Sequence, residues 1–154
     1  MTRRTAAGDR FSAIAIAVLQ LGALLERAGD AIAEPAGQSA ARWKVMGLVD
    51  DEPRTVADIA RIMKLARQSV QRVVDALLAD GIVAEQDNPA HQRARLVALT
   101  PRGRKALDQI EEVQHAWANR VAARLGATVL ERAPELLEHL LDAVERDPVT
   151  EQSR

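Results

Sequence analysis

The 154-residue chain contains no cysteine and no tyrosine, and only one phenylalanine and two tryptophans. The absence of cysteine excludes disulfides, thiolate zinc sites and cysteine redox sensing. With so few aromatic residues, Leu, Val, Ile and Ala must form the core, and a hydrophobic share of 47% is enough for one. The longest apolar stretch, residues 14–25, is interrupted by Gln20, and we expect it to be too short to span a bilayer.

Signatures of targeting and of catalysis are also lacking. The N-terminal "MTRRTAAGDRF" has acidic Asp9 among its arginines, so we expect no signal peptide, no membrane partner and a soluble cytoplasmic protein. The three histidines, His91, His115 and His139, show no metal-ligand spacing on one helix. No nucleophile elbow, phosphate loop or paired catalytic carboxylate motif is present. We therefore expect no enzyme activity, no metal and no cofactor.

What the chain does have is an uneven distribution of charge. Its net charge is -1, but residues 54–105 hold ten Lys or Arg against five Asp or Glu, a local charge of +5. This asymmetry indicates one basic surface on an otherwise acidic protein, which is typical of nucleic-acid binding. Chance clustering is the alternative.

Apolar residues at the two ends of the chain follow heptad spacing. The first seam lies in a helix predicted from about Asp9 to Ala33, and it consists of Phe11, Ile14, Val18, Leu21, Leu25, Ala28 and Ile32. The second seam consists of Leu130, Ala133, Leu137, Leu140 and Val144. Thr128 and Glu131 suggest a capping box before it, and Pro134 is expected to kink or restart this helix. The seams can pack within one chain or between two copies, and we favour two copies.

The segment between the seams has clear start and stop signals. Ser39 is expected to cap a helix that carries Trp43, and Thr55 to cap a second helix. A third helix occupies residues 66–81, ended by Gly81, and two short strands at 82–86 and 94–99 flank a polar turn. Thr100 and Pro101 begin a long helix that reaches about Leu125. The predicted fold is mainly α with a small β-hairpin wing, a winged helix-turn-helix.

The third helix has the composition of a DNA recognition helix. Val70, Val73, Val74, Leu77 and Leu78 form an apolar stripe, so the polar residues of the first turns face away from the core. Arg67 suits guanine or a phosphate, and Gln68 and Gln71 suit adenine. Ser69 and Arg72 are better placed for the DNA backbone. A solvated helix face without ligand is the alternative.

The hairpin tip carries further candidates for DNA contact, which are His91, Gln92, Arg93 and Arg95. A wing of this kind lies over the minor groove next to the recognition helix, and a narrow minor groove attracts arginine. Arg95 stays open between phosphate contact and ordinary surface, as do Arg102, Arg104 and Lys105 after the hairpin.

Two nearby stretches, "TVADIARIMKLARQSVQRVVDALLADGIV" and "NPAHQRARLVALTPRGRKAL", resemble the multiple-antibiotic-resistance regulator (MarR) family of bacterial transcriptional regulators. The most specific part is Arg93, with Thr100 seven residues later and Gly103 three further. The resemblance implies a homodimer joined through the first, fifth and sixth helices. It also implies binding to pseudo-palindromic double-stranded DNA, release by a small ligand in a crevice between the dimer and DNA-binding parts, and a minor-groove role for Arg93.

The sequence departs from the family pattern at two positions. Ala66 stands where the family usually has Thr or Ser, so the recognition helix lacks a side-chain N-cap, which costs roughly 1 kcal/mol. His91 replaces an acidic residue that commonly orients the wing arginine.

We therefore predict a dimeric, sequence-specific DNA-binding transcriptional regulator, a repressor released from its operator by a small aromatic or apolar effector. Residues 39–105 would form the DNA-binding domain, and residues 1–38 and 106–154 the helical dimerisation region. Trp43 and Trp117 are candidate ligand contacts, with core or dimer packing as the alternative. A winged-helix protein-interaction module without DNA binding is the alternative function.

Overall fold

The computed structural model describes residues 3–91 and 93–147, so the predicted wing residue Gln92 lies outside the described residues. The chain divides into two compact units, residues 1–113 and residues 114–154. Each unit is described by itself.

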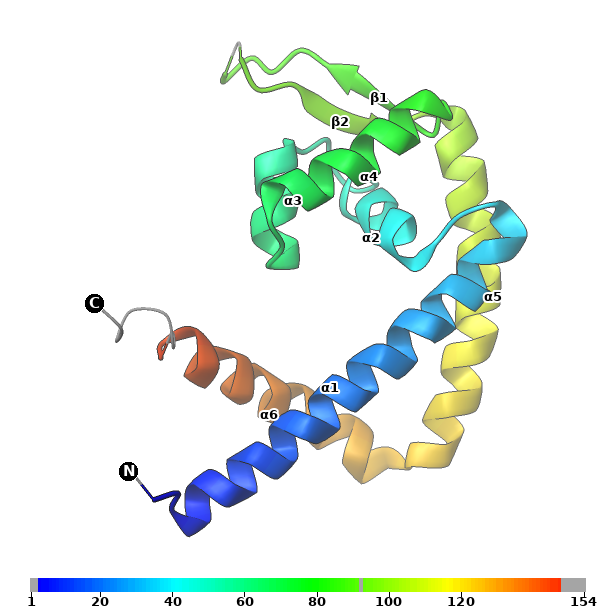
Figure 1. Ribbon diagram of the computed structural model, residues 1–154. Helices are drawn as coiled ribbons and strands as arrows, with labels where there is room; N and C mark the ends of the chain where they lie inside the picture. Colours follow the sequence, from blue (N-terminus) through cyan, green and yellow to red (C-terminus); the bar gives the residue numbers. More distant parts are fainter. Residues whose placement is uncertain (1–2, 92, 148–154) are drawn as a thin grey trace. The chain divides into compact units, whose positions relative to one another are not determined.

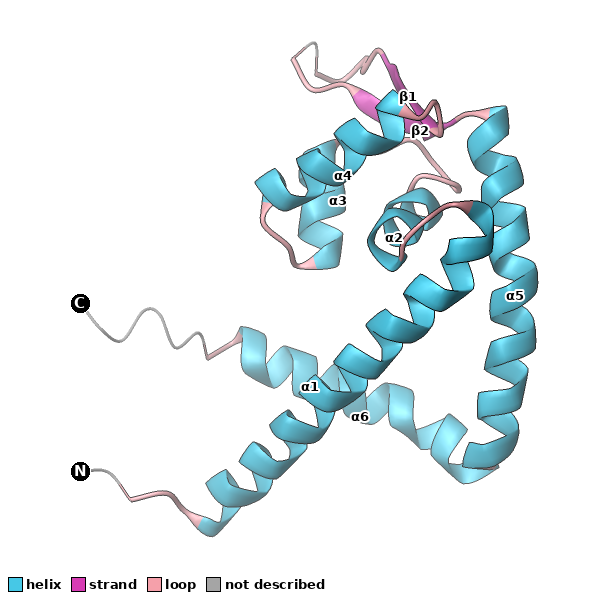
Figure 2. Ribbon diagram, turned by 45° about the vertical axis from the view of Figure 1, so that its right-hand side comes forward, coloured by secondary structure: helices cyan, strands magenta, loops and turns pink. Residues whose placement is uncertain are grey.

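The first unit contains the predicted winged helix-turn-helix preceded by a long helix (Figures 1 and 2). The predicted order of elements is confirmed. The elements are α1 (Ala6–Ala33), the 3-10 helix η1 (Glu34–Ala36), α2 (Ala40–Leu48), α3 (Val56–Met63), α4 (Arg67–Ala79), β1 (Val83–Gln86), β2 (Leu96–Leu99) and the start of α5 (Pro101–Leu125).

Side-chain caps set the starts of three helices. The Ser39 hydroxyl accepts a hydrogen bond from the Arg42 N–H at 3.3 Å, and the Thr55 hydroxyl accepts one from the Asp58 N–H at 3.1 Å. Both caps were predicted. α1 begins three residues before the predicted Asp9, because the Thr5 hydroxyl accepts from the Gly8 N–H at 3.1 Å.

The core of this unit is aliphatic, as the composition requires. Helices α2, α3, α4 and α5 and both strands contribute fully buried side chains. The largest are Met46, Ile59, Leu77, Leu107, Ile110, Val45, Val70, Val74 and Val97. One face of α4 packs against this core, and the opposite face is exposed to solvent.

The hairpin is anchored on both sides. β1 and β2 are antiparallel, with Val83 opposite Leu99 and Gln86 opposite Leu96. On its other edge Val97 exchanges two backbone hydrogen bonds with Arg54, at 2.8 and 3.1 Å. The base of the wing is therefore held by the loop that precedes α3.

A close joint connects the end of α4, the start of β1 and the start of α5. The Thr100 hydroxyl donates to the Gly81 carbonyl at 2.7 Å and accepts from the Gly103 N–H at 3.0 Å. The Thr100 N–H donates to the Ile82 carbonyl at 3.1 Å. A Cβ atom on Gly103 would lie 2.1 Å from that same carbonyl oxygen, so only glycine fits.

Helix α1 is apolar on several sides and largely exposed. Leu19 is 74% exposed and Ile16 57%, and the seam residues Phe11, Ile14, Val18, Leu21 and Leu25 are exposed as well. Among the described residues, one helix, Ala6–Ala36, is long and apolar enough to cross a membrane by length and composition alone. The expectation that this region is too short for a bilayer is therefore wrong, although one such helix near the N-terminus is weak evidence for a span.

The second unit contains the end of α5 and helix α6 (Ala127–Glu145). The predicted capping box is wrong: Gly126, with φ +76°, is the N-cap, and Thr128 lies inside the first turn. Pro134 is accommodated inside one helix rather than restarting it. No described residue of α6 is buried, and its exposed large apolar side chains are Val129, Leu130, Leu136, Leu137, Leu141 and Val144.

The Gly103 joint predicts a large, local stability effect. Gly103→Ala would force a methyl group against the Ile82 carbonyl and lower the free energy of unfolding by roughly 3 kcal/mol. The matched control is Gly47→Ala in α2, where an added Cβ meets no atom within 4 Å. This control should be neutral or stabilising by about 0.5–1 kcal/mol, the usual gain on replacing a helical glycine. Denaturant unfolding at one fixed protein concentration measures both, and equal stability of the two variants would contradict the prediction.

Candidate nucleic-acid interface

The start of α4 has no side-chain cap, as predicted. Ala66 is the N-cap residue, with φ −62° and ψ 135°, and it makes no side-chain hydrogen bond. The Ser69 N–H donates to the Ala66 carbonyl at 3.0 Å, so water or a ligand is left to satisfy the N–H groups of Arg67 and Gln68, which carry the positive end of the helix dipole.

The outer face of α4 presents the predicted polar residues to solvent. Val70, Val74 and Leu77 are buried, and the exposed residues of the first turns are Arg67, Gln68, Ser69 and Arg72. Gln71 is half-buried, and its side-chain amide donates a hydrogen bond to Asp75 at 2.8 Å. Gln71 would therefore have to give up this bond in order to donate to another group, whereas the Gln68 side chain makes no hydrogen bond with any residue that the structure describes.

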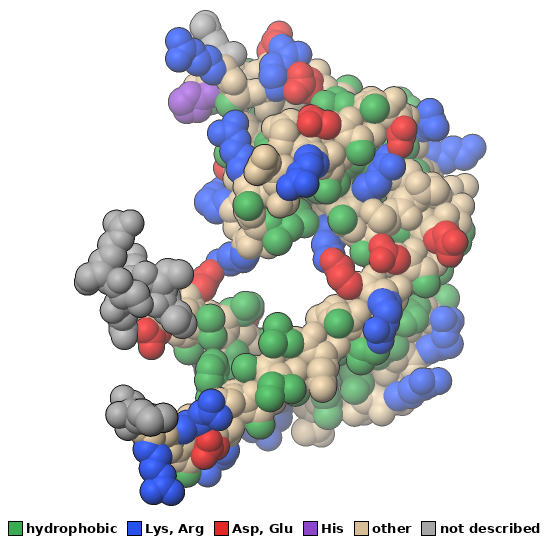
Figure 3. Space-filling view, viewed as in Figure 1, with side chains coloured by type: hydrophobic (Ala, Val, Ile, Leu, Met, Phe, Trp, Pro, Cys, Tyr) green, Lys and Arg blue, Asp and Glu red, His purple; other side chains and the backbone are tan. Residues whose placement is uncertain are grey.

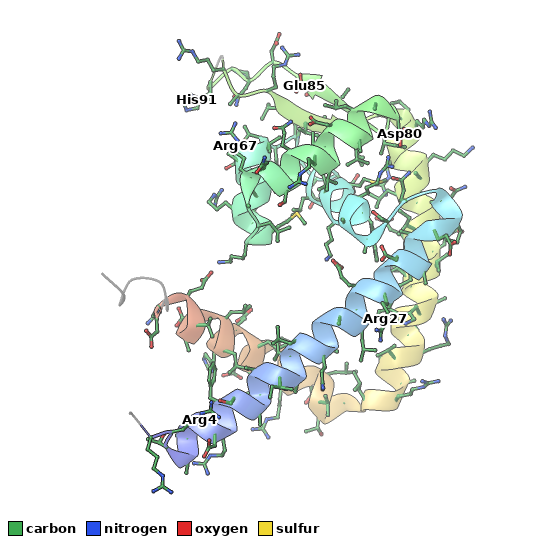
Figure 4. The ribbon with its side chains drawn as sticks, viewed as in Figure 1. Arg4, Arg27, Arg67, Asp80, Glu85 and His91 are labelled. Carbon is green, nitrogen blue, oxygen red and sulfur yellow. The ribbon has the colours of Figure 1, made fainter. Side chains whose placement is uncertain are left out.

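A concave site of about 220 Å³ joins α4 to the wing. It is lined by the start of α3, by Arg67 and Gln71 of α4, and by Glu85, Arg93, Ala94 and Arg95 of the hairpin. Figure 4 shows Arg67 and His91 toward the same edge of the domain, and Figure 3 shows Lys and Arg side chains gathered around that edge. The structure thus brings the recognition-helix and wing candidates together, and His91 is exposed at the tip.

The two wing arginines are in different situations. Arg95 forms ion pairs with Asp87, at 2.5 Å, and with Glu85, at 3.6 Å. Arg93 is exposed and forms no ion pair with any residue that the structure describes. Asp87 and Glu85 were not singled out from the sequence. The sequence does contain a signal for them, because the predicted hairpin places these acidic residues across from Arg95.

Helix α3 is held by its own charged residues. The hydrogen bond that Asp58 accepts from the Thr55 hydroxyl, at 2.7 Å, lowers the pKa of the Asp58 carboxyl, and Arg61 at 3.0 Å lowers it further. Because the folded-state pKa is lowered, this carboxylate stabilises the fold above its ordinary pKa, and the contribution is lost as the pH falls through the folded value. The side chain is exposed, so the contribution is small.

Arg104, which the sequence left open as a phosphate contact, is used inside the protein. Its guanidinium bonds to Asp50 after α2, to Asp108 at 2.8 Å and to Glu111 at 3.2 Å. The hydrogen bond to Asp50 is the main cause of a raised pKa of this guanidinium, with Asp108 adding to it. Arg104 thus ties α5 to the end of α2 and is not free for DNA.

A second, apolar pocket lies between α1 and α2. Its volume is about 570 Å³, and its lining includes Gly22, Leu25, Trp43 and an ion pair at its rim. That pair joins Lys44 to Glu26 at 2.5 Å and was not anticipated from the sequence. Trp43 is half-buried here, and Trp117 is half-buried in the second unit.

Comparison with known proteins agrees with this arrangement. A family model described as "MarR family" matches residues 37–94, which include α2, α3, α4 and β1 but not β2. An uncharacterised protein of Mycobacterium tuberculosis is 31% identical over 139 residues, covering 90% of this chain and 97% of that protein. The chain belongs to the MarR family. As a MarR family protein it is a DNA-binding transcriptional regulator.

Solved structures show the same fold. A mutant of MarR from E. coli in complex with operator DNA has a TM-score of 0.78 and 20% identity, covering 86% of this chain and 96% of that one. A MarR family protein of Mycobacterium tuberculosis in complex with salicylic acid has a TM-score of 0.61 and 27% identity, covering 80% and 92%. The winged helix-turn-helix prediction is confirmed.

Proposed function

We propose that this MarR family protein is a cytoplasmic homodimeric repressor that binds a pseudo-palindromic operator and is released by a small ligand. The observation that carries the proposal is the exposed, basic and uncapped start of α4 beside Arg93, which forms no ion pair with any described residue. A major groove accepts such a helix by its N-terminal end, and the minor groove beside it accepts the wing.

Each side chain of the interface has a proposed role. Gln68 and Gln71 read adenine edges, and Arg67 pairs with guanine or a phosphate. Ser69 and Arg72 bind phosphates and set the register. On the wing, Arg93 enters the minor groove, with His91 beside it and Gln92 adjacent in the sequence.

A winged-helix module that binds only proteins is the competing proposal. The core of such an interface would be expected to be enriched in aromatic side chains and to have few charged ones. The exposed part of α4 from Arg67 to Arg72 is instead polar or cationic, which supports DNA.

Dimerisation is proposed to cover the exposed apolar faces of α1 and α6. Each helix, taken by itself, leaves several large aliphatic side chains in solvent, as Figure 3 shows for α1. Soluble proteins rarely leave apolar patches of this extent uncovered. Residues 1–38 and 106–154 are therefore proposed as the dimerisation region and residues 39–105 as the DNA-binding domain.

The pocket between α1 and α2 is proposed to accept a small aromatic or apolar effector. Its lining is mainly apolar, and Lys44 and Glu26 supply polar groups at the rim. Asp30 of α1 also accepts a hydrogen bond from the first N–H of α2, at 2.8 Å. An effector that shifts α2 relative to α1 would thereby act on the DNA-binding domain through linkage. Trp117 is kept as a second candidate contact.

Base reading predicts a sequence-dependent loss of affinity. Gln68→Ala should weaken binding to a selected operator by about 1–3 kcal/mol and binding to random DNA very little, and Gln71→Ala should behave in the same way. Arg72→Ala is the matched control for phosphate contact: it should weaken both and reduce the salt slope by about 0.9 per contact. Fluorescence anisotropy over a salt series measures these values. If the glutamine variants lost equal affinity for the operator and for random DNA, Gln68 and Gln71 would not be base-reading residues.

The dimer proposal predicts that charge on α1 prevents assembly. Replacing Leu21 and Leu25 together by Glu would place two carboxylates in the proposed seam, where burying an unpaired charge is too costly to tolerate. Analytical ultracentrifugation should show monomers that bind operator DNA weakly. Gln20→Glu, which adds a charge outside the seam, should remain dimeric. A double variant that sediments as a dimer and still binds its operator would show that the seam is assigned wrongly.

The effector proposal predicts linked ligand and DNA binding. In a Trp117→Phe background, salicylate as a probe should quench the fluorescence of Trp43 and lower operator affinity, and operator DNA should lower salicylate affinity by the same factor. Gly22→Leu should abolish the quenching, because an added side chain at Gly22 meets only open pocket space. Unchanged operator affinity with salicylate, and with every other small aromatic that quenches Trp43, would exclude this mechanism.

A further inference from the structure

The tip of the wing carries an ion-pair cluster at the point where the hairpin ladder ends. The last backbone pair of the hairpin is Gln86 opposite Leu96. One step beyond it, Asp87 and Arg95 stand opposite each other, and their side chains meet at 2.5 Å. Glu85 approaches the Nε of Arg95 at 3.6 Å. Three charged groups thus close the hairpin where the pairing of its two strands ends.

The orientation of this cluster follows from strand alternation. Side chains two residues apart on a strand lie on the same face, so Glu85 and Asp87 share the face of buried Val83. Arg95 likewise shares the face of buried Val97. The face that is apolar at the base of the hairpin is therefore charged at its tip. It lines the concave site beside Arg67 and the start of α3.

We infer that Arg95 is a positioning residue of the wing and not a DNA contact. Its guanidinium, just before β2, pairs with Asp87 and Glu85 at the end of β1. These contacts hold together the two ends of the loop that carries His91 and Arg93. Arg93, which has no ion pair with a described residue, is left to meet the DNA. This inference rests on the proposed DNA-binding function, and it replaces the minor-groove contact that the sequence suggested for Arg95.

The size of the effect follows from the exposure of the cluster. The Asp87 side chain is 94% exposed, and an exposed ion pair contributes little to global stability. Replacement of Arg95 should therefore leave the midpoint of the unfolding transition unchanged and make the loop less ordered. Because a disordered wing must be ordered when it binds, operator affinity should fall about 3- to 10-fold.

The test compares Arg95→Gln with Arg93→Gln in the full-length protein. The DNA is a duplex selected by the wild type from a random library. Arg95→Gln should speed hydrogen exchange of the amides at 90, 91, 93 and 94 in the free protein, with α4 unchanged, and weaken binding without changing its salt slope. Arg93→Gln should leave that exchange unchanged and lower the slope by about 0.9 per wing. Arg146→Gln, which removes an exposed arginine paired with Asp142 on α6, is the matched control and should change none of these quantities.

A charge-reversed pair, Asp87→Arg with Arg95→Asp, should restore both the slow exchange and the affinity. The inference is overturned if Arg95→Gln lowers the salt slope as Arg93→Gln does, if wing exchange is unchanged, or if the loosened wing binds the duplex with wild-type affinity. If the wild type selects no duplex at all, the proposed function fails, and the exchange measurement in the free protein still decides whether Arg95 holds the wing.

Discussion

The close approach of Gly103 to the Ile82 carbonyl is the contact on which the DNA-binding half depends. At this joint the recognition helix ends, the first wing strand begins and the long helix α5 starts, within hydrogen-bonding distance of one threonine hydroxyl. Any side chain at 103 would push α5 away from the hairpin. Because β2 leads directly into α5, such a shift would also move the wing relative to α4. The pattern of Thr100 followed by Gly103 is therefore a packing requirement, which explains why it marks the fold so specifically.

Two further connections extend this joint toward the proposed effector pocket. Arg104, one residue after Gly103, holds Asp50 at the end of α2, and Arg42 of α2 holds Asp80 at the end of α4 at 2.6 Å. α2 is thus linked to both α5 and α4 by ion pairs, while Asp30 of α1 caps its start. A ligand between α1 and α2 would therefore act on a helix that ion pairs connect to both α4 and α5.

Most of the local structure could be predicted from the sequence, because its signals are local. Ser39 and Thr55 begin helices where capping chemistry requires it, Gly81 adopts a positive φ, and the aliphatic stripe of α4 faces the core. The charged contacts of Arg95 and Arg104 could not be predicted in the same way, since they depend on which residues meet across strands and helices. Thr128 shows the limit of a capping motif: its spacing is correct, but Gly126 allows the helix to begin earlier. The exposed seam of α1 in a single chain is compatible with the predicted packing between two copies, but a heptad pattern does not by itself identify what covers the seam.

The internal use of several arginines changes how this regulator would search for its site. Of the basic residues between 54 and 105, Arg54, Arg61, Arg95 and Arg104 each hold a carboxylate, so the segment presents a weaker field to DNA than its composition suggests. A protein that neutralises few phosphates binds random sequences weakly and leaves them quickly. Its acidic flanks would also repel DNA that approaches from other directions, so that productive encounters occur mainly in one orientation. Such a molecule would spend little of its time bound to random DNA and would stay available for its specific sites.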